Sequence, residues 1–169
     1  MLFRSADTTN ATSTDRLRLY VNGSRITAFS IANYPPQNFD TFINQSGVAH
    51  YLGRMFVNSY FNGYLADIHF IDGQALDPTS FGEFDTNGVW QPIAYTGSYG
   101  TNGFHLPFSD NSTAAALGTD TSGNGNDWTP NNLQVSAGSV YSNNISTSVG
   151  SYQSGYARTN LFDGSTSTF

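Results

Sequence analysis

The chain of 169 residues is long enough for one domain with a buried core, and its composition limits what that domain can be. The formal net charge is −6, and the six basic residues are all Arg and form no cluster, which argues against a nucleic-acid partner. Cysteine is absent, so disulfides and thiolate metal sites are excluded. No apolar run approaches the about 18 residues of a membrane helix, and the first residues resemble no signal peptide, so no membrane insertion is expected.

The residues available for a core are mainly aromatic, with 13 Phe, 10 Tyr and 2 Trp. Aromatic residues suit the half-buried surface of a pleated sheet, whereas the 17 Gly, 6 Pro and many Asn, Ser, Thr and Asp residues supply turns. No long segment has an apolar period of 3.6 residues. The sequence therefore predicts an all-β protein.

The clearest predicted element is a hairpin near the N-terminus. Residues 16–21 alternate between apolar and polar side chains, Asn22-Gly23 follows directly, and a second alternating run covers 25–29. An Asn-Gly pair between such runs is a strong hairpin signal, because both turn residues then need a positive φ.

Further elements follow along the chain. Asp77-Pro78 favours one short helical turn over 77–81, with Asp77 as its cap and Pro78 at its first position. Strands are predicted over 48–57, 61–71, 88–95 and 103–109, and a loop over 30–47.

The composition changes after residue 110. Residues 110–134 are rich in Asn, Ser, Gly and Asp, and 136–169 combine a Ser/Asn/Gly-rich linker with what resembles the start of a following β module. We therefore expect one domain over 1–135 and a separate segment over 136–169.

Three separated segments carry a resemblance to a known family. The segment FNGYLADIHFIDGQAL at 61–76 resembles a core strand of the laminin-G-like, concanavalin A-like jelly-roll family. The segment GTDTSGNGNDW at 118–128 resembles a second signature of these modules, and RLRLYVNGSRI at 16–26 resembles the preceding hairpin. The matching positions of the first segment are Gly63, Leu65, Asp67, Ile68, Phe70, Ala75 and Leu76. The resemblance implies an antiparallel two-sheet jelly-roll sandwich.

The full combination resembles a subgroup of these modules in structural proteins of marine phages. It implies a non-enzymatic virion protein of a tail fibre, appendage or capsid surface, with host-glycan recognition as a further role. By the same resemblance we expect other virion proteins as partners and a homo-oligomer, with a trimer by analogy. The family's sandwich begins with strands upstream of Asp7, so we expect the chain to be the C-terminal portion of a longer sandwich.

An alternative function is a carbohydrate-binding module or a glycoside hydrolase-related domain. A retaining glycosidase needs two carboxylates about 5 Å apart. Glu83-Phe84-Asp85 resembles the start of a glucanase motif, but Glu83 is the chain's single Glu, and the second catalytic Glu has no counterpart. We therefore expect a surface turn here and no enzymatic activity.

Two kinds of ligand site remain open. A calcium loop is one interpretation of residues 120–127, because oxygen-bearing side chains alternate there and Gly125 stands at the sixth position; an ordinary tight turn, our default, explains the same pattern. The candidate calcium ligands are Asp120, Ser122, Asn124, Asn126 and Asp127.

The candidate carbohydrate-binding residues are aromatic. Trp90, Tyr95 and Tyr99 lie on or beside a Gly-rich loop, where rings can stack on a pyranose, although filling the core is the commoner role of such residues. The histidines His50, His69 and His105 are isolated in sequence. We expect each to be a half-buried strand residue rather than part of a zinc site or a catalytic triad.

Overall fold

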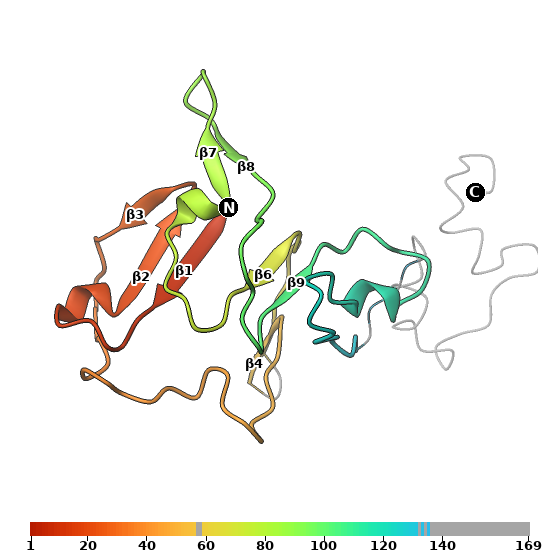
Figure 1. Cartoon of the computed structure of the whole chain (residues 1–169), viewed down its shortest axis with the longest axis horizontal. Helices are drawn as coiled ribbons and strands as arrows, with labels where there is room; N and C mark the ends of the chain where they lie inside the picture. The colour runs from red at the N-terminus through yellow and green to blue at the C-terminus, as the bar shows by residue number, and fades with distance from the viewer. Residues whose placement is uncertain (57–58, 132, 134, 136–169) are drawn as a thin grey trace, which may run out of the picture.

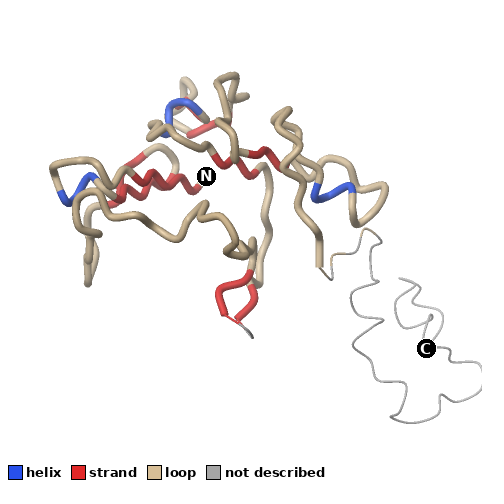
Figure 2. Tube along the Cα trace, turned by 60° about the horizontal axis from the view of Figure 1, so that its bottom comes forward, coloured by secondary structure: helices blue, strands red, loops and turns tan. Residues whose placement is uncertain are grey.

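The computed structural model describes residues 1–56, 59–131, 133 and 135, and in this part of the chain it is all-β (Figure 1). The described residues form nine short strands and three 3₁₀ turns and contain no α-helix, and most of the other described residues are loop (Figure 2). The strands are β1 (Leu2–Ala6), β2 (Leu17–Val21), β3 (Ser24–Ile26), β4 (Arg54–Phe56), β5 (Ser59–Tyr60), β6 (Ile68–Phe70), β7 (Gly82–Phe84), β8 (Trp90–Pro92) and β9 (Phe104–Leu106). The 3₁₀ turns are η1 (Ser13–Asp15), η2 (Pro78–Ser80) and η3 (Ala116–Gly118).

All the strand pairs are antiparallel and form four small sheets within the described residues: β1-β2-β3, β4-β5, β6-β9 and β7-β8. The β6–β9 pair lies between the β1-β2-β3 sheet and the loops of residues 107–131, and the β7–β8 hairpin projects beside it (Figure 1). The prediction of an all-β chain is thus confirmed.

The predicted N-terminal hairpin is confirmed as β2 and β3. Its turn residues Asn22 and Gly23 have φ values of 46° and 75°, as the Asn-Gly signal requires. The structure adds β1, which pairs along the whole length of β2, whereas the sequence prediction begins this sheet at residue 16. β1 lacks a clear apolar alternation, because Ser5 takes a buried position and accepts a hydrogen bond from Arg18 Nη2 at 3.2 Å.

The prediction of one strand over 61–71 is wrong in its extent. Only β6, at Ile68–Phe70, is a strand, and the segment before it is loop. Asp67 has a φ of 53°, in the left-handed region, so the chain turns sharply just before β6. The predicted strand over 48–57 is likewise reduced to β4 at Arg54–Phe56 within the described residues.

The predicted helical turn is confirmed as η2, with Asp77 at the N-cap and Pro78 at the first position. The Asp77 side chain does not cap the turn. Its carboxylate instead forms an ion pair with Arg18 Nη1 at 3.2 Å, which ties this turn to β2. The predicted strands over 88–95 and 103–109 contain the shorter β8 and β9.

The core of the described residues is small and centred on four buried side chains, Tyr20, Phe81, Phe104 and Leu106. Phe3 joins two of them, with its ring centroid 5.6 Å from that of Tyr20 and 5.5 Å from that of Phe81. On the other side, the Trp128 ring packs on Phe104 at 4.9 Å. The Phe81 ring, directly after η2, lies 5.3 Å from the His69 ring of β6, so ring contacts connect the N-terminal sheet to the central strands.

The predicted separate segment 136–169 lies outside the described residues. Among the residues that the structure describes, there is no helix of the length and apolar character needed to cross a membrane.

We expect Leu106→Ala to lower the free energy of unfolding by about 2–5 kcal/mol, because Leu106 is 1% exposed and its loss leaves a cavity in the centre of the core. Urea denaturation followed by tryptophan fluorescence measures the change. Leu2→Ala is the control: Leu2 is 67% exposed, so a change within about 0.5 kcal/mol is expected. Equal losses in the two variants would contradict this assignment of the core.

Candidate functional site

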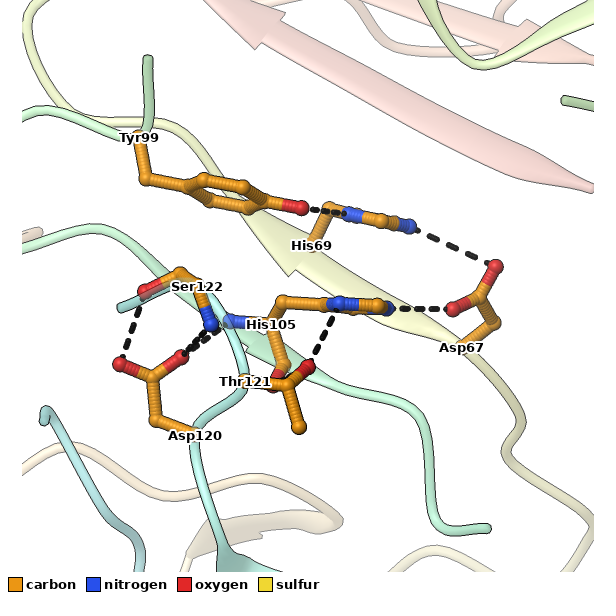
Figure 3. Close-up of polar contacts among 7 residues, drawn as sticks. All are labelled: Asp67, His69, Tyr99, His105, Asp120, Thr121 and Ser122. Carbon is orange, nitrogen blue, oxygen red and sulfur yellow. Dashed lines mark hydrogen bonds and ion pairs between the residues drawn. The ribbon is translucent and has the colours of Figure 1, made fainter. Parts of the chain in front are cut away.

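Antiparallel pairing of β6 and β9 places His69 directly opposite His105. The two imidazole rings stack with centroids 4.1 Å apart and planes 9° apart (Figure 3). Successive side chains of a strand point to opposite faces, so the histidines lie on the face away from the buried Phe104 and Leu106. Two histidines that are 36 positions apart in the sequence thus form one local unit.

A carboxylate completes this unit. Asp67 Oδ1 lies 2.7 Å from His105 Nε2, and Asp67 Oδ2 lies 3.4 Å from His69 Nε2 (Figure 3). The left-handed backbone at Asp67 turns the chain so that the Asp67 side chain points toward both rings. We call Asp67, His69 and His105 the Asp-His-His cluster.

A hydroxyl group lies within hydrogen-bond distance of the other nitrogen, Nδ1, of each ring. The Tyr99 hydroxyl lies 2.8 Å from His69 Nδ1, and Thr121 Oγ1 lies 2.8 Å from His105 Nδ1. These contacts fix both ring orientations with Nε2 toward Asp67. The cluster is accordingly preorganised by four separate segments, namely β6 with the preceding Asp67, β9, the loop that carries Tyr99 and the loop that carries Thr121.

The environment shifts the pKa values of the groups in this site. Burial lowers the pKa of His69 below 6.5, and the charge of His105 adds to this effect, while Asp67 partly opposes it. For Asp67, burial raises the pKa, but hydrogen bonds and charges from the two histidines outweigh burial and hold it below 3.8. Burial, with the nearby charge of Asp67, raises the pKa of Tyr99 to about 12. Asp67 is therefore ionised and Tyr99 neutral at physiological pH.

The cluster has the donor set of a transition-metal site. One ligand atom from each of the three residues lies within 4.8 Å of the other two. Two imidazole nitrogens and one carboxylate oxygen are a common set of protein ligands for zinc and related metals. The side chain of Asp67 is 52% exposed, whereas those of His69 and His105 are 13% and 23% exposed, so the site opens to solvent on the carboxylate side.

Sequence reasoning did not bring these residues together. His69 and His105 are half-buried strand residues as predicted, whereas His50 is exposed and outside any strand, so the prediction is wrong for His50. The available signal was that Ile68-His69-Phe70 and Phe104-His105-Leu106 each place His between two large apolar residues. Only the pairing of the two strands turns this shared pattern into a site.

The candidate calcium residues lie together in a loop next to the cluster. The Asp120 carboxylate is buried and accepts hydrogen bonds from the backbone N–H groups of His105, Ser122 and Asn126 and from the Ser122 hydroxyl. Burial raises the pKa of Asp120, but these hydrogen bonds outweigh it and lower the pKa overall. Asp120 therefore joins the loop to β9 by accepting from the backbone.

The other polar side chains of this loop also bond to the protein. Asp127 Oδ1 accepts from the Asp120 N–H at 2.8 Å, and the Asn124 and Asn126 amides both donate to the Gly103 carbonyl at 2.9 Å. These contacts are those of a tight turn, which was the default interpretation. Calcium binding at this loop stays a prediction.

The three candidate carbohydrate-binding aromatics occupy two places. A Cβ added at Gly23 or at Gly82 would clash with the Trp90 ring, so Trp90 packs over the β2–β3 turn and against β7 of its own hairpin. Tyr95 and Tyr99 meet edge to face with centroids 5.2 Å apart, beside His69. The structure thus brings two of the three residues together and leaves Trp90 apart, and sugar binding by any of them stays a prediction.

The candidate acidic motif at the β7–β8 hairpin is part of a turn. Asp85 Oδ1 accepts hydrogen bonds at 2.8 Å from the N–H groups of Asn87 and Val89. Glu83 lies in β7 opposite Gln91. These contacts match the surface turn expected from the sequence.

In comparisons with known proteins, no family model, no curated protein and no solved structure matches this chain.

We expect acidification from about pH 7 to about pH 5 to lower the free energy of unfolding through His69. The unfolded chain takes up a proton at the ordinary pKa of 6.5, whereas folded His69 does so only at lower pH, so protons favour the unfolded state within this window. Urea denaturation at a series of pH values measures the slope. His69→Gln should flatten it. An unchanged slope in His69→Gln would contradict the lowered pKa of His69.

Proposed function

We propose that this protein is a non-enzymatic structural and adhesive module of a phage virion, and that it assembles with other protein subunits. The observation that carries this proposal is an exposed apolar surface. Of the twenty large hydrophobic side chains that are exposed in the described residues, thirteen lie between residues 29 and 65. Their exposed fractions reach 71% for Phe42, 75% for Met55 and 101% for Tyr64.

A contiguous exposed apolar surface typically marks a protein interface, so a segment with this many exposed large apolar side chains is our candidate for one. Part of this surface is hollowed, with an apolar depression of about 460 Å³ lined by residues that include Leu52, Met55, Phe61 and Leu65. We call the exposed side chains of residues 29–65 the apolar face. A homo-oligomer, most simply a trimer by analogy with fibre proteins, would cover it.

The finer features of the proposal are supported by the sequence resemblance. Four small antiparallel sheets in an all-β chain are compatible with parts of a two-sheet jelly-roll sandwich, the fold that the resemblance implies. The placement of Asp85 in a turn supports a module without catalytic carboxylates over one that hydrolyses glycosides. Location in a virion follows from the same resemblance.

We expect the protein to form an oligomer whose mass is a multiple of 18.3 kDa, and the double variant Phe42→Ser/Met55→Ser to dissociate. Each apolar side chain buried in an interface contributes about 1.5–3 kcal/mol, so the loss of two should weaken association about 100-fold or more. Light scattering coupled to size-exclusion chromatography over a dilution series measures the mass.

The matched control is Leu2→Ser, which removes an exposed apolar side chain outside the apolar face and should leave the mass unchanged. A parent protein that stays monomeric at high concentration would contradict the proposal. Dissociation of the Leu2→Ser variant to the same degree would show that association does not depend specifically on the apolar face.

A second candidate function, host-glycan recognition, is favoured by the contact of Tyr95 and Tyr99 beside polar side chains of the site. An aromatic ring can stack on the apolar face of a sugar, and neighbouring polar groups can form hydrogen bonds with its hydroxyl groups. We expect binding on a glycan array to be lost in Tyr99→Ala and kept in Tyr99→Phe, which retains the ring, and in the control Tyr64→Ala. Equal binding by the parent protein and Tyr99→Ala, with folding intact, would exclude this role for Tyr99.

A further inference from the structure

We propose that the Asp-His-His cluster binds a divalent transition-metal ion of the zinc class. The cluster offers two imidazole nitrogens, His69 Nε2 and His105 Nε2, and one carboxylate, that of Asp67. This mixed nitrogen and oxygen set is one that Zn²⁺ accepts readily, whereas Ca²⁺ and Mg²⁺ prefer oxygen ligands throughout. The proposal is independent of the assembly and glycan functions proposed above.

The contacts around the cluster prepare the histidines as ligands. A metal-binding histidine uses one ring nitrogen for the metal and commonly donates the N–H of the other to a neighbouring oxygen. Tyr99 Oη and Thr121 Oγ1 each lie 2.8 Å from an Nδ1 atom and can accept such bonds. Thr121 Oγ1 also donates to the His105 carbonyl at 3.3 Å, which leaves its lone pairs for the Nδ1–H of His105.

The centre of the cluster requires a positive charge between His105 Nε2 and the Asp67 carboxylate. If Nδ1–H is donated to Thr121, a neutral His105 would present an Nε2 lone pair to the ionised Asp67 oxygen 2.7 Å away, whereas the hydrogen bond that lowers the pKa of Asp67 needs a proton on Nε2. Two electron-rich atoms at that separation need a positive charge between or beside them, which is either a proton or a metal ion. The metal-bound form satisfies both histidines and Asp67 with one ion.

The site can adjust to an ion and can be reached by it. Four tetrahedral ligands about 2.0–2.2 Å from zinc lie about 3.3–3.6 Å from one another, so Asp67 Oδ1 must move away from His105 and the rings must tilt from parallel. Asp67 lies outside the strand and its side chain is 52% exposed, so it is the ligand that can move most easily. Its exposed side also leaves room for water as a fourth ligand.

Titration of the full chain with ZnCl₂, followed by calorimetry, tests the proposal. We expect one Zn²⁺ per chain and a higher melting temperature with Zn²⁺ that His105→Ala removes, and no effect of CaCl₂ or MgCl₂ that depends on His105. Loss of an outer hydrogen-bond partner typically weakens metal binding 10–100-fold, so Thr121→Val should raise Kd about 10-fold. Loss of a ligand in His105→Ala should raise it by about 100-fold or more.

The control variant is His50→Ala, which should bind Zn²⁺ as the parent protein does, because His50 lies outside the Asp-His-His cluster and its Nε2 bonds to the backbone of Asn44 and Phe42. Circular dichroism checks that each variant is folded. If His105→Ala unfolds, Asp67→Asn takes its place, since Asp67 is half exposed and precedes the strand.

The spectroscopic signature of the proposed site is specific. Long-range ¹H–¹⁵N spectra of the histidine rings should show Nδ1–H on both His69 and His105 when Zn²⁺ is present, and no change at His50. Absence of Zn²⁺ binding, equal affinity in the parent protein and the ligand variants, or loss of binding in His50→Ala would each overturn the proposal.

Discussion

The pairing of β6 with β9 is the interaction on which both the core and the candidate site depend. On one face it places the Phe70 ring 5.5 Å from that of Phe104 and supports the fully buried Leu106. On the other face it stacks His69 on His105. Three residue pairs therefore join segments more than thirty positions apart, and no other sheet in the described residues joins strands so distant in sequence.

Short acidic and amide side chains organise the loops around this pair. Asp and Asn accept hydrogen bonds from backbone N–H groups two residues ahead, which forms a compact turn without a helix or a long strand. This contact recurs at Asp7, Asn10, Asp85, Asp110 and Asp120. The composition reflects this use, because a carboxylate on the longer Glu side chain fits such turns less well, and the chain contains eleven Asp and one Glu. The negative charge of the protein is thus partly a consequence of how its loops are built.

Local features of the fold were predictable from sequence, whereas contacts between distant segments were not. The Asn22-Gly23 hairpin and the Asp77-Pro78 turn depend on backbone preferences of adjacent residues, and both occur where predicted. The extent of β6 was not predictable, because the left-handed conformation of Asp67 is favoured by its contacts with the two histidines. The Asp-His-His cluster requires the β6–β9 pairing, and apolar alternation does not specify which strand is the partner.

The alternation of faces along β6 and β9 has a mechanical consequence. If β9 slipped by one residue relative to β6, His105 would turn to the opposite face and Phe104 or Leu106 would take its place beside His69. A three-residue pair has few hydrogen bonds to resist such a slip. Anything held jointly by Asp67, His69 and His105, whether a proton or an ion, is lost in the slipped arrangement and so favours the native register. The cluster thereby stabilises the native register of β6 and β9, and a bound proton or ion would increase the stability of this strand pair.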